Sequence, residues 1–279
     1  MTKKRLLVVT QEMDPYTENT FMSDLITRLP QYAQDKGAFE LRVLMPKYGS
    51  INERRHRLHE VVRLSGMNII IDDDDYPLVI KVASMPNSRM QVYFLENEDY
   101  FKRKNCATDV STDEEGNAYE DNHERMIFFS KAVLETVKKF GWAPDVIHCH
   151  GWLTSMIPLF VKEAYIHEPI FKHSTVVYSL YNNTPLDQVP ENFVAKGSIN
   201  TLNSEFLAPY FDGTNFTVDK GACHYADAII KGEEEINETV SAQIANMEKP
   251  ILEFQDNENY LVKYIDFYKD LLSASEASE

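Results

Sequence analysis

Hydrophobic positions in the first fifty residues alternate between short apolar runs and a segment of helical period. The run 5–10 is rich in Leu and Val, which is typical of a central parallel strand. Apolar residues then recur at helical spacing over 22–33, and Pro30 is expected to bend this helix. A second apolar run, 39–45, ends at Pro46, so the pattern predicts a β-α-β unit.

The pattern changes between residues 59 and 97, where β-rich runs are separated by turn residues. These runs cover 60–64, 67–71, 78–83 and 90–95. They predict antiparallel hairpins, which would form a β-hairpin insertion of about 59–97 in an α/β domain. The segment 104–121 is polar, acidic and without periodicity, so we predict a mobile loop there.

Strand and helix signals alternate again from residue 122 onward. The predicted elements are a helix capped by Asn122, a strand at 146–149, a helical segment up to 162, a strand at 174–180, a helix at 215–226, a strand at 227–230, a charged helix from near Glu233 and an amphipathic helix at 261–272. With right-handed crossovers, this order predicts one α/β domain over 1–272, built on a doubly wound, mostly parallel Rossmann-like sheet. A frayed tail is expected at 273–279.

Composition and charge limit the partners of the protein. The formal net charge of -16 argues against binding nucleic acid or an anionic membrane through a general basic surface. No apolar stretch is long enough to span a bilayer, and the run after Lys3, Lys4 and Arg5 is too short for a signal-peptide core. Three widely spaced cysteines indicate neither a disulfide framework nor a Cys-x-x-Cys metal site, so we predict a cytoplasmic protein.

The sharpest local feature is the sequence His-Cys-His-Gly-Trp at the end of the strand predicted for 146–149. Period-two geometry places His148 and His150 on one face of this strand and Cys149 on the other. The carboxyl ends of parallel strands are where ligands bind in open α/β sheets. Two imidazoles on one face can share a metal ion, but the sequence offers no third ligand nearby. This favours a hydrogen-bonded lining of a cleft over a metal site.

Other candidate sites have weaker signals. The loop 11–19 lacks the glycines of a dinucleotide fingerprint or a phosphate loop, which argues against a conventional NAD site. The acidic run 72–75 is interpreted as a solvated turn rather than a cation site. Arg54, Arg55 and Arg57 are able to grip a phosphate or carboxylate, but exposed charges after a turn are more often solvated or weakly paired.

Two aromatic residues and one serine complete the candidate chemistry. Trp152 and Tyr181 follow predicted strand ends and could stack on a sugar ring, although a large aromatic residue at a strand-helix junction usually belongs to the core. Ser179 lies outside any Gly-x-Ser-x-Gly turn, so nothing indicates a nucleophilic serine.

Several segments, in the right order, resemble the bacterial glycogen synthase and plant starch synthase family. The segments are the opening strand and Glu-x-x-Pro loop (8–16), Arg-Val-Leu-Met-Pro-Lys-Tyr-Gly (42–49), Val-Tyr-Phe-Leu (92–95) with Tyr-Phe-Lys-Arg (100–103), Phe-Phe-Ser (128–130), the Pro-Asp-x-x-His-x-His element (144–162), Lys-Gly (220–221) and Tyr-Ala-Asp-Ala (225–228). The resemblance implies the N-terminal lobe of a two-domain GT-B glycosyltransferase, with ADP-glucose as donor and an α-1,4-glucan as acceptor. On this basis we assign substrate-binding roles to Tyr16, His148, His150, Trp152 and Tyr181, and expect no metal ion and no cofactor besides the donor.

Departures from the family pattern fall on the expected donor site. The family's Lys-Thr-Gly-Gly-Leu stands here as residues 18–22, so Glu18 replaces a cation where a diphosphate is expected, and this charge repels rather than stabilises it. Gly151 replaces the Asp of His-x-His-Asp-Trp, and Ser179 aligns with an active-site histidine. The C-terminal lobe, which provides most ADP contacts in the family, is expected to have no counterpart after about Ile230. Catalytic residues therefore stay unassigned, and a partner chain is expected to supply the nucleotide half.

Two functions follow from the resemblance. The first is a glycogen or starch synthase-like glucosyltransferase domain, incomplete without a second lobe. The alternative is a non-catalytic glucan-binding or regulatory protein of glycogen metabolism, which Glu18, Gly151 and Ser179 favour. A third and weaker hypothesis is a metal-dependent α/β hydrolase built on His148 and His150.

Overall fold

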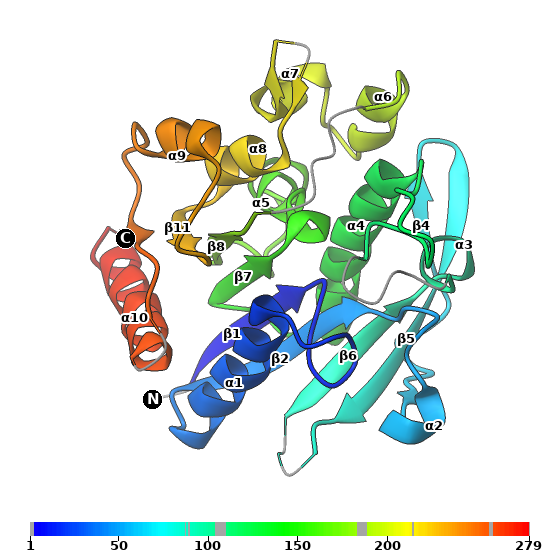
Figure 1. Ribbon diagram of the computed structural model, residues 1–279, viewed down its shortest axis with the longest axis horizontal. Coiled ribbons are helices and arrows are strands. Elements are labelled where there is room, and N and C mark those ends of the chain that lie inside the picture. The colour runs from blue at the N-terminus through cyan, green and yellow to red at the C-terminus, as the bar shows by residue number, and fades with distance from the viewer. Residues whose placement is uncertain are drawn as a thin grey trace.

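The computed structural model describes residues 3–86, 88, 90–103, 110–182, 189–213, 215–256 and 259–278. In this part of the chain, a ten-stranded sheet has the strand order β12-β11-β8-β7-β1-β2-β6-β5-β3, and β4 pairs with β5 (Figure 1). The parallel strands are β1 (Lys4–Thr10), β2 (Phe39–Pro46), β6 (Gln91–Glu96), β7 (Val146–His150), β8 (Thr175–Leu180), β11 (Ala228–Lys231) and β12 (Ile251–Leu252). The predicted α/β class with a mostly parallel sheet is therefore confirmed.

An antiparallel extension continues the sheet beyond β6. It consists of β3 (His59–Glu60), β4 (Met67–Ile71) and β5 (Asp74–Ser84), and β5 pairs antiparallel with all its neighbours. The predicted hairpins are present, but 90–95 is not part of a separate insertion, because β6 also pairs in parallel with β2. The continuous burial of Val92 to Leu95 is what a central strand requires. Of the run 60–64, only the first residue is in a strand.

Helices cover both faces of the sheet. Their bounds are α1 (Phe21–Asp35), α2 (Glu53–His56), α3 (Glu98–Phe101), α4 (Asn122–Phe140), η1 (Trp152–Thr154), α5 (Ile157–Leu159), η2 (Phe160–Ala164), α6 (Phe193–Gly197), α7 (Ser204–Leu207), η3 (Ala208–Tyr210), α8 (Val218–Tyr225), α9 (Glu238–Ile244) and α10 (Tyr260–Ser278). A small ladder joins β9 (Phe211–Asp212) to β10 (Asn215–Phe216).

The two faces of β8 show how these helices are distributed. On one face, Tyr178 donates a hydrogen bond to Asp219 of α8. On the other face, Ser179 is hydrogen-bonded to His148, which is also bonded to Tyr268 of α10. α10 packs beside α1, and α4, α5 and α8 contact one another in series (Figure 1). Because β12 pairs with β11 and α10 covers this sheet, the residues after Ile230 complete the same lobe.

Several predicted boundaries are wrong for local reasons. Asn122 is the first helical residue rather than the cap, because its amide donates to Ser111 O and its Oδ1 accepts from Arg125. The charged helix expected from Glu233 begins at Glu238, where the Asn237 side chain caps Thr239 N.

Other differences concern the ends of elements. Residues 215 and 216 pair in β10, so the helix predicted for 215–226 begins at Val218. The short strand β12 was not predicted. α10 continues to Ser278, through most of the segment expected to be frayed. Within the predicted mobile loop, 104–109 lies outside the described residues, and 110–121 forms turns with a bridge between Thr112 and Ala118.

Candidate functional site

The candidate site lies at the carboxyl ends of β1 and β7, where a crevice is expected in a doubly wound sheet. The chain leaves β1 toward β2 on one side, and β7 lies on the other, so the strand order reverses at this point. Ligands bind at such reversal points in doubly wound sheets. The first loop (residues 11–20) follows β1, and Gly151 follows β7, so both segments of the family resemblance meet here.

Gln11 occupies the space beside Gly151. Gly151 has φ 85° and ψ 162°, a backbone region that is open almost only to glycine. A Cβ atom at this position would lie 2.3 Å from the Gln11 side chain, whose Oε1 accepts a hydrogen bond from Leu153 N at 3.3 Å. A side chain from the first loop therefore fills the space that a side chain at position 151 would need.

The rest of the first loop closes on itself at the N-terminus of α1. Glu12, only 8% exposed, accepts hydrogen bonds from Gln11 Nε2 (3.1 Å) and from Thr20 Oγ1 (2.7 Å). Thr20 and Ser23 form a capping box, in which each side chain accepts from the other residue's backbone N–H. A helix N-terminus is a usual site for phosphate, but this one is capped by its own residues and has a buried carboxylate beside it. Glu18 is exposed on the same loop.

His148 and His150 project to the same face, as the period of two predicts, and form a closed histidine network with Ser179, Tyr181 and Tyr268. His148 Nε2 is hydrogen-bonded to Ser179 Oγ (2.7 Å), and His148 Nδ1 to Tyr268 Oη (2.6 Å). His150 Nε2 lies 3.0 Å from His148 Nδ1, and His150 Nδ1 lies 2.8 Å from Tyr181 Oη. Both imidazoles are completely buried.

Burial keeps the two imidazoles neutral. It lowers the pKa of His150 to about 3, and it lowers the pKa of His148 well below the usual value, with a further contribution from His150. Burial also raises the pKa of Tyr181 and Tyr268. A neutral network supplies no charge to stabilise a phosphate group. Among the described residues, no three His, Cys, Asp or Glu side chains converge as metal ligands.

The structure brings together only part of the predicted substrate-binding set. His148, His150 and Tyr181 meet in the histidine network, together with Ser179. Trp152, 1% exposed, is in the core at the start of η1. Tyr16 is separate, and its ring packs edge-on against Phe94 (4.8 Å) and His56 (5.0 Å). Each of the five side chains is at most 5% exposed, and their role in substrate binding stays a prediction.

The sequence interpretation missed the tyrosines of α10. Tyr260, Tyr264 and Tyr268 recur at a spacing of four, which places them on one face of the helix. Tyr264 and Tyr268 cover His148, with ring centroids 6.0 and 5.6 Å from it. The spacing was a visible signal, but the contact with a strand 120 residues away required the tertiary fold.

The charged segments behave as the sequence suggested. The acidic run 72–75 is exposed at the tip of the β4–β5 hairpin, where 72 and 73 form the turn and Asp74 and Asp75 begin β5. The three arginines, Arg54, Arg55 and Arg57, are exposed around α2. Glu53 fixes this short helix to the sheet through an ion pair with Lys81 at 2.7 Å.

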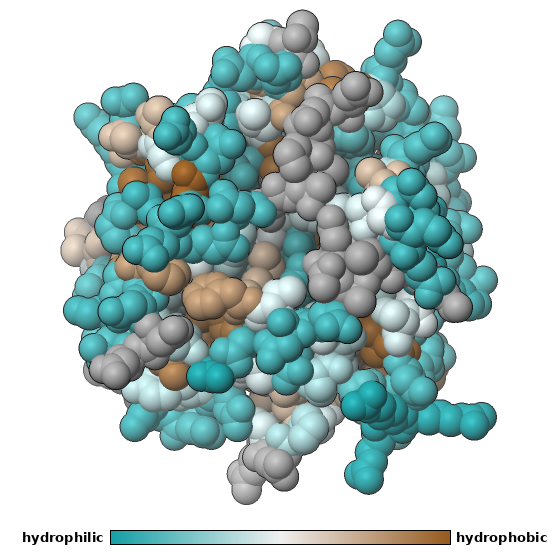
Figure 2. Space-filling model, in the orientation of Figure 1, coloured by the Kyte–Doolittle hydropathy of each residue, from teal (hydrophilic) through white to brown (hydrophobic). Residues whose placement is uncertain are grey.

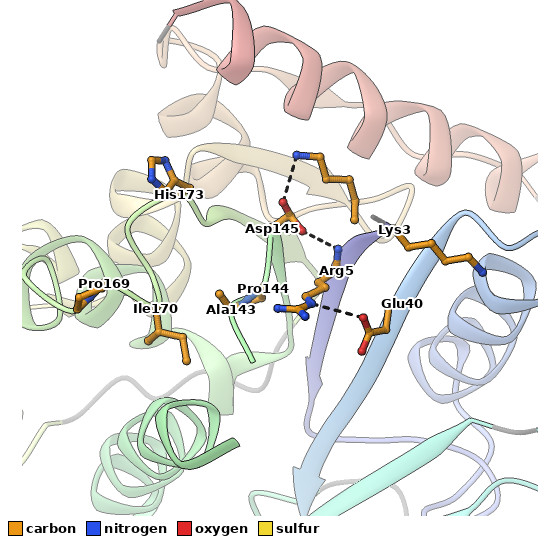
Figure 3. A pocket seen from close by; sticks show the side chains of 10 residues that line it. Lys3, Arg5, Glu40, Ala143, Pro144, Asp145, Pro169, Ile170 and His173 are labelled. Carbon is orange, nitrogen blue, oxygen red and sulfur yellow. Dashed lines mark hydrogen bonds and ion pairs between the residues drawn. The ribbon is translucent and has the colours of Figure 1, made fainter. Parts of the chain in front are cut away.

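A cavity of about 490 Å³ lies at the opposite, amino edge of the sheet, where β1 and β7 begin (Figure 3). Its lining includes Arg5, Glu40 and Asp145. These charges are already engaged, because Arg5 Nε lies 3.4 Å from Glu40 Oε2 and Asp145 accepts a hydrogen bond from Arg5 N at 2.7 Å. Since strands direct ligands to their carboxyl ends, this cavity is separate from the candidate site.

Comparison with known proteins identifies the family of this chain. The family model described as "Starch synthase catalytic domain" matches residues 5–248. The chain belongs to this family. Relatives named "Glycogen synthase" from Chlorobium luteolum and Chlorobaculum tepidum are 42% and 40% identical to it over 178 residues. Each match covers 64% of this chain and 36% of the relative, so the match spans about a third of these glycogen synthases.

A solved structure shares the fold. The catalytic domain of Starch Synthase IV from Arabidopsis thaliana, bound to ADP and acarbose, superposes with a TM-score of 0.70 at 16% identity. The match covers 91% of this chain and 52% of that one. In the described part of this chain, helices long and apolar enough to cross a bilayer are absent.

Proposed function

We propose that this chain acts in α-glucan synthesis as the acceptor-binding lobe of a glycogen or starch synthase. Transfer of glucose from ADP-glucose to an α-1,4-glucan would then need a second lobe in addition to the one that the described residues form. Family membership, the glycogen synthase relatives and the single lobe formed by the described residues support this function. The buried thiols Cys149 and Cys223 are compatible with a reducing cytoplasm, where we place the protein.

The first loop is the observation that carries this proposal. Its helix N-terminus is capped by Thr20 and Ser23, it has the Glu12 carboxylate at its side, and it exposes Glu18 where the family has a lysine. Two carboxylates near a diphosphate are unfavourable, because like charges repel strongly in a partly desolvated site. The donor must therefore obtain its cationic contacts from outside this lobe, whereas a neutral glucan is not repelled.

A non-catalytic role is the second candidate, and the histidine network favours it. His148 and His150 are buried, neutral and bonded to each other and to hydroxyl groups. No ring nitrogen of this pair is left to move a proton to or from a substrate. On this hypothesis the chain binds glucan and regulates or targets another enzyme.

Two measurements separate these hypotheses. The first is transfer of radiolabelled glucose from ADP-glucose to glycogen. It is measured with the purified chain alone and after addition of the C-terminal lobe of a glycogen synthase, purified separately. We expect no transfer by the chain alone; incorporation would show that the donor site is complete. Transfer with the added lobe supports the synthase role, and its absence supports the non-catalytic one. The second measurement is affinity electrophoresis in glycogen or amylopectin gels, in which unretarded migration would contradict both.

A further inference from the structure

Two aromatic rings lie together at the carboxyl edge of the sheet, and the candidate site described above does not use them. Phe21 is the first residue of α1, directly after the first loop, and Phe254 follows β12 by two residues. Their ring centroids are 5.9 Å apart with an interplanar angle of 48°. Because β1 and β12 belong to the same parallel array, both rings emerge at the edge where ligands bind.

Phe21 is held at the start of a helix, Phe254 follows a strand, and both rings remain accessible. Phe21 is 43% exposed. The other exposed large hydrophobic side chains among the described residues are Val or Ile. Its backbone is fixed by the capping box of Thr20 and Ser23. Phe254 is half-buried, and its neighbour Glu253 is tied to Lys231 by an ion pair of 2.7 Å. A ring whose backbone is already ordered loses little conformational entropy when a ligand covers it.

Carboxylates and amides lie near the two rings in the sequence, together with Thr20 directly before Phe21 and with Lys231, which pairs with Glu253. Glu18 and Asn19 precede Phe21 and are exposed, and Glu253 and Gln255 flank Phe254. Such groups hydrogen-bond to hydroxyls, whereas carboxylates repel phosphates. The chemistry therefore suits a neutral polyhydroxylated ring that offers an apolar C–H face to an aromatic side chain. It does not suit a nucleotide or a sugar phosphate.

Two aromatic side chains alone do not make a stable protein interface. A standard interface buries about 800 Å² on each partner and contains a continuous apolar centre. The face shown in Figure 2 is mostly hydrophilic, with small and separate apolar areas. One pyranose ring, by contrast, needs only one or two aromatic faces for stacking.

We propose that Phe21 and Phe254 form an aromatic platform that binds a glucose unit of an α-1,4-glucan. This proposal rests on the proposed function, and it assigns the glucan to the rim of the crevice rather than to the buried His148, His150, Trp152 and Tyr181.

The test measures the affinity of the full chain for maltoheptaose by calorimetry and for glycogen by affinity electrophoresis. Phe21→Ala and Phe254→Ala are expected to weaken both by about tenfold, since loss of an aromatic contact removes on the order of 1.4 kcal/mol. Val62→Ala is the matched control, because Val62 is 78% exposed and follows β3 at the other end of the strand order.

Phe21→Trp provides a reading that is independent of affinity. The native tryptophans, Trp142 and Trp152, are 4% and 1% exposed, so glucan should hardly change their fluorescence. In Phe21→Trp, we expect affinity within about threefold of the native chain and a fluorescence change that saturates with maltoheptaose.

The outcomes separate this proposal from the function on which it rests. If the native chain binds glucan and both alanine variants bind equally well, the platform is wrong and the proposed function stands. If the native chain binds no glucan, the proposed function fails and the platform fails with it. If Phe21→Ala abolishes self-association, measured by light scattering, while its maltoheptaose affinity is unchanged, the rings bind a second copy of the chain and the glucan platform is overturned.

Discussion

The first loop and the histidine network meet at the same edge of the sheet but differ in their access to solvent. The first loop exposes Glu18 and presents Phe21 at its end. The network is sealed by α10, and none of its five side chains is more than 3% exposed. Polar residues at a ligand-binding edge can therefore have opposite roles. We expect changes in the network to alter stability and changes in the loop to alter ligand binding.

His148→Ala should have the largest effect and tests the structural role of the network. The change removes a completely buried ring together with its hydrogen bonds to Tyr268, Ser179 and His150. We expect the free energy of unfolding to fall by about 4 kcal/mol, from cavity formation and unpaired polar groups together. Urea denaturation at pH 7 measures it. Tyr268→Phe, which removes one hydroxyl without a cavity, should cost about 1 kcal/mol. If both variants lose the same small amount of unfolding free energy, the network does not have the structural role assigned to it.

Gly151→Ala should lower the free energy of unfolding by about 3 kcal/mol, because positive φ and a clash with Gln11 act together. Gly66→Ala is the matched control: Gly66 has φ 76°, but nothing lies within 4 Å of the added Cβ. It should lose only about 1 kcal/mol, from backbone strain alone. In the double variant Gln11→Ala/Gly151→Ala, the part of the lost free energy of unfolding that comes from the clash should be recovered. Thermal or urea denaturation measures it. A Gly151→Ala variant no less stable than Gly66→Ala would show that Gln11 does not fill this space.

Stability should also depend on pH through the two histidines. Their pKa values are lowered in the folded protein, so the unfolded chain binds protons first as pH falls below about 6.5. The stabilisation is complete above this pH and is lost as pH falls toward the folded pKa, about 3 for His150. For His150 alone the loss at pH 5 is about 2 kcal/mol. Urea denaturation at pH 7, 6 and 5 measures the slope. An NMR signal assigned to the imidazole of His148 or His150 that titrates near 6.5 in the folded state would contradict this prediction.

Sequence patterns anticipated the local parts of this architecture and missed the long-range ones. The apolar runs and helical periods located β1, α1, β2, β7 and β8, because burial on two faces or on one helical stripe leaves a periodic trace. The same-face geometry of His148 and His150 followed from the period of a strand. The pairing of β6 with β2 was missed, although the fully apolar run of β6 carried a signal for it.

The contacts that give the candidate site its character join residues far apart in sequence. His148 meets Tyr268 across 120 residues, and Gln11 reaches the Gly151 turn by accepting from Leu153 N across 142. Neither contact has a local pattern, because each depends on which helix covers the sheet and on how two loops fit. The sequence placed the histidines at the crevice, but only the packing of α10 shows that they are closed off from it.

Glu18→Lys is the smallest of these changes and the most direct test of the first loop. Glu18 is exposed, so the free energy of unfolding should change by less than about 0.5 kcal/mol. Replacing an anion by a cation next to the expected diphosphate should raise the affinity for ADP about fivefold at low salt, and less at high salt because ions screen the pair. Fluorescence anisotropy with labelled ADP measures this, with Glu205→Lys, on the exposed surface of α7, as the control for net charge. An equal gain in the control would mean that only the overall charge matters. A gain confined to Glu18→Lys would locate the donor beside the first loop and show that a single surface charge weakens its binding.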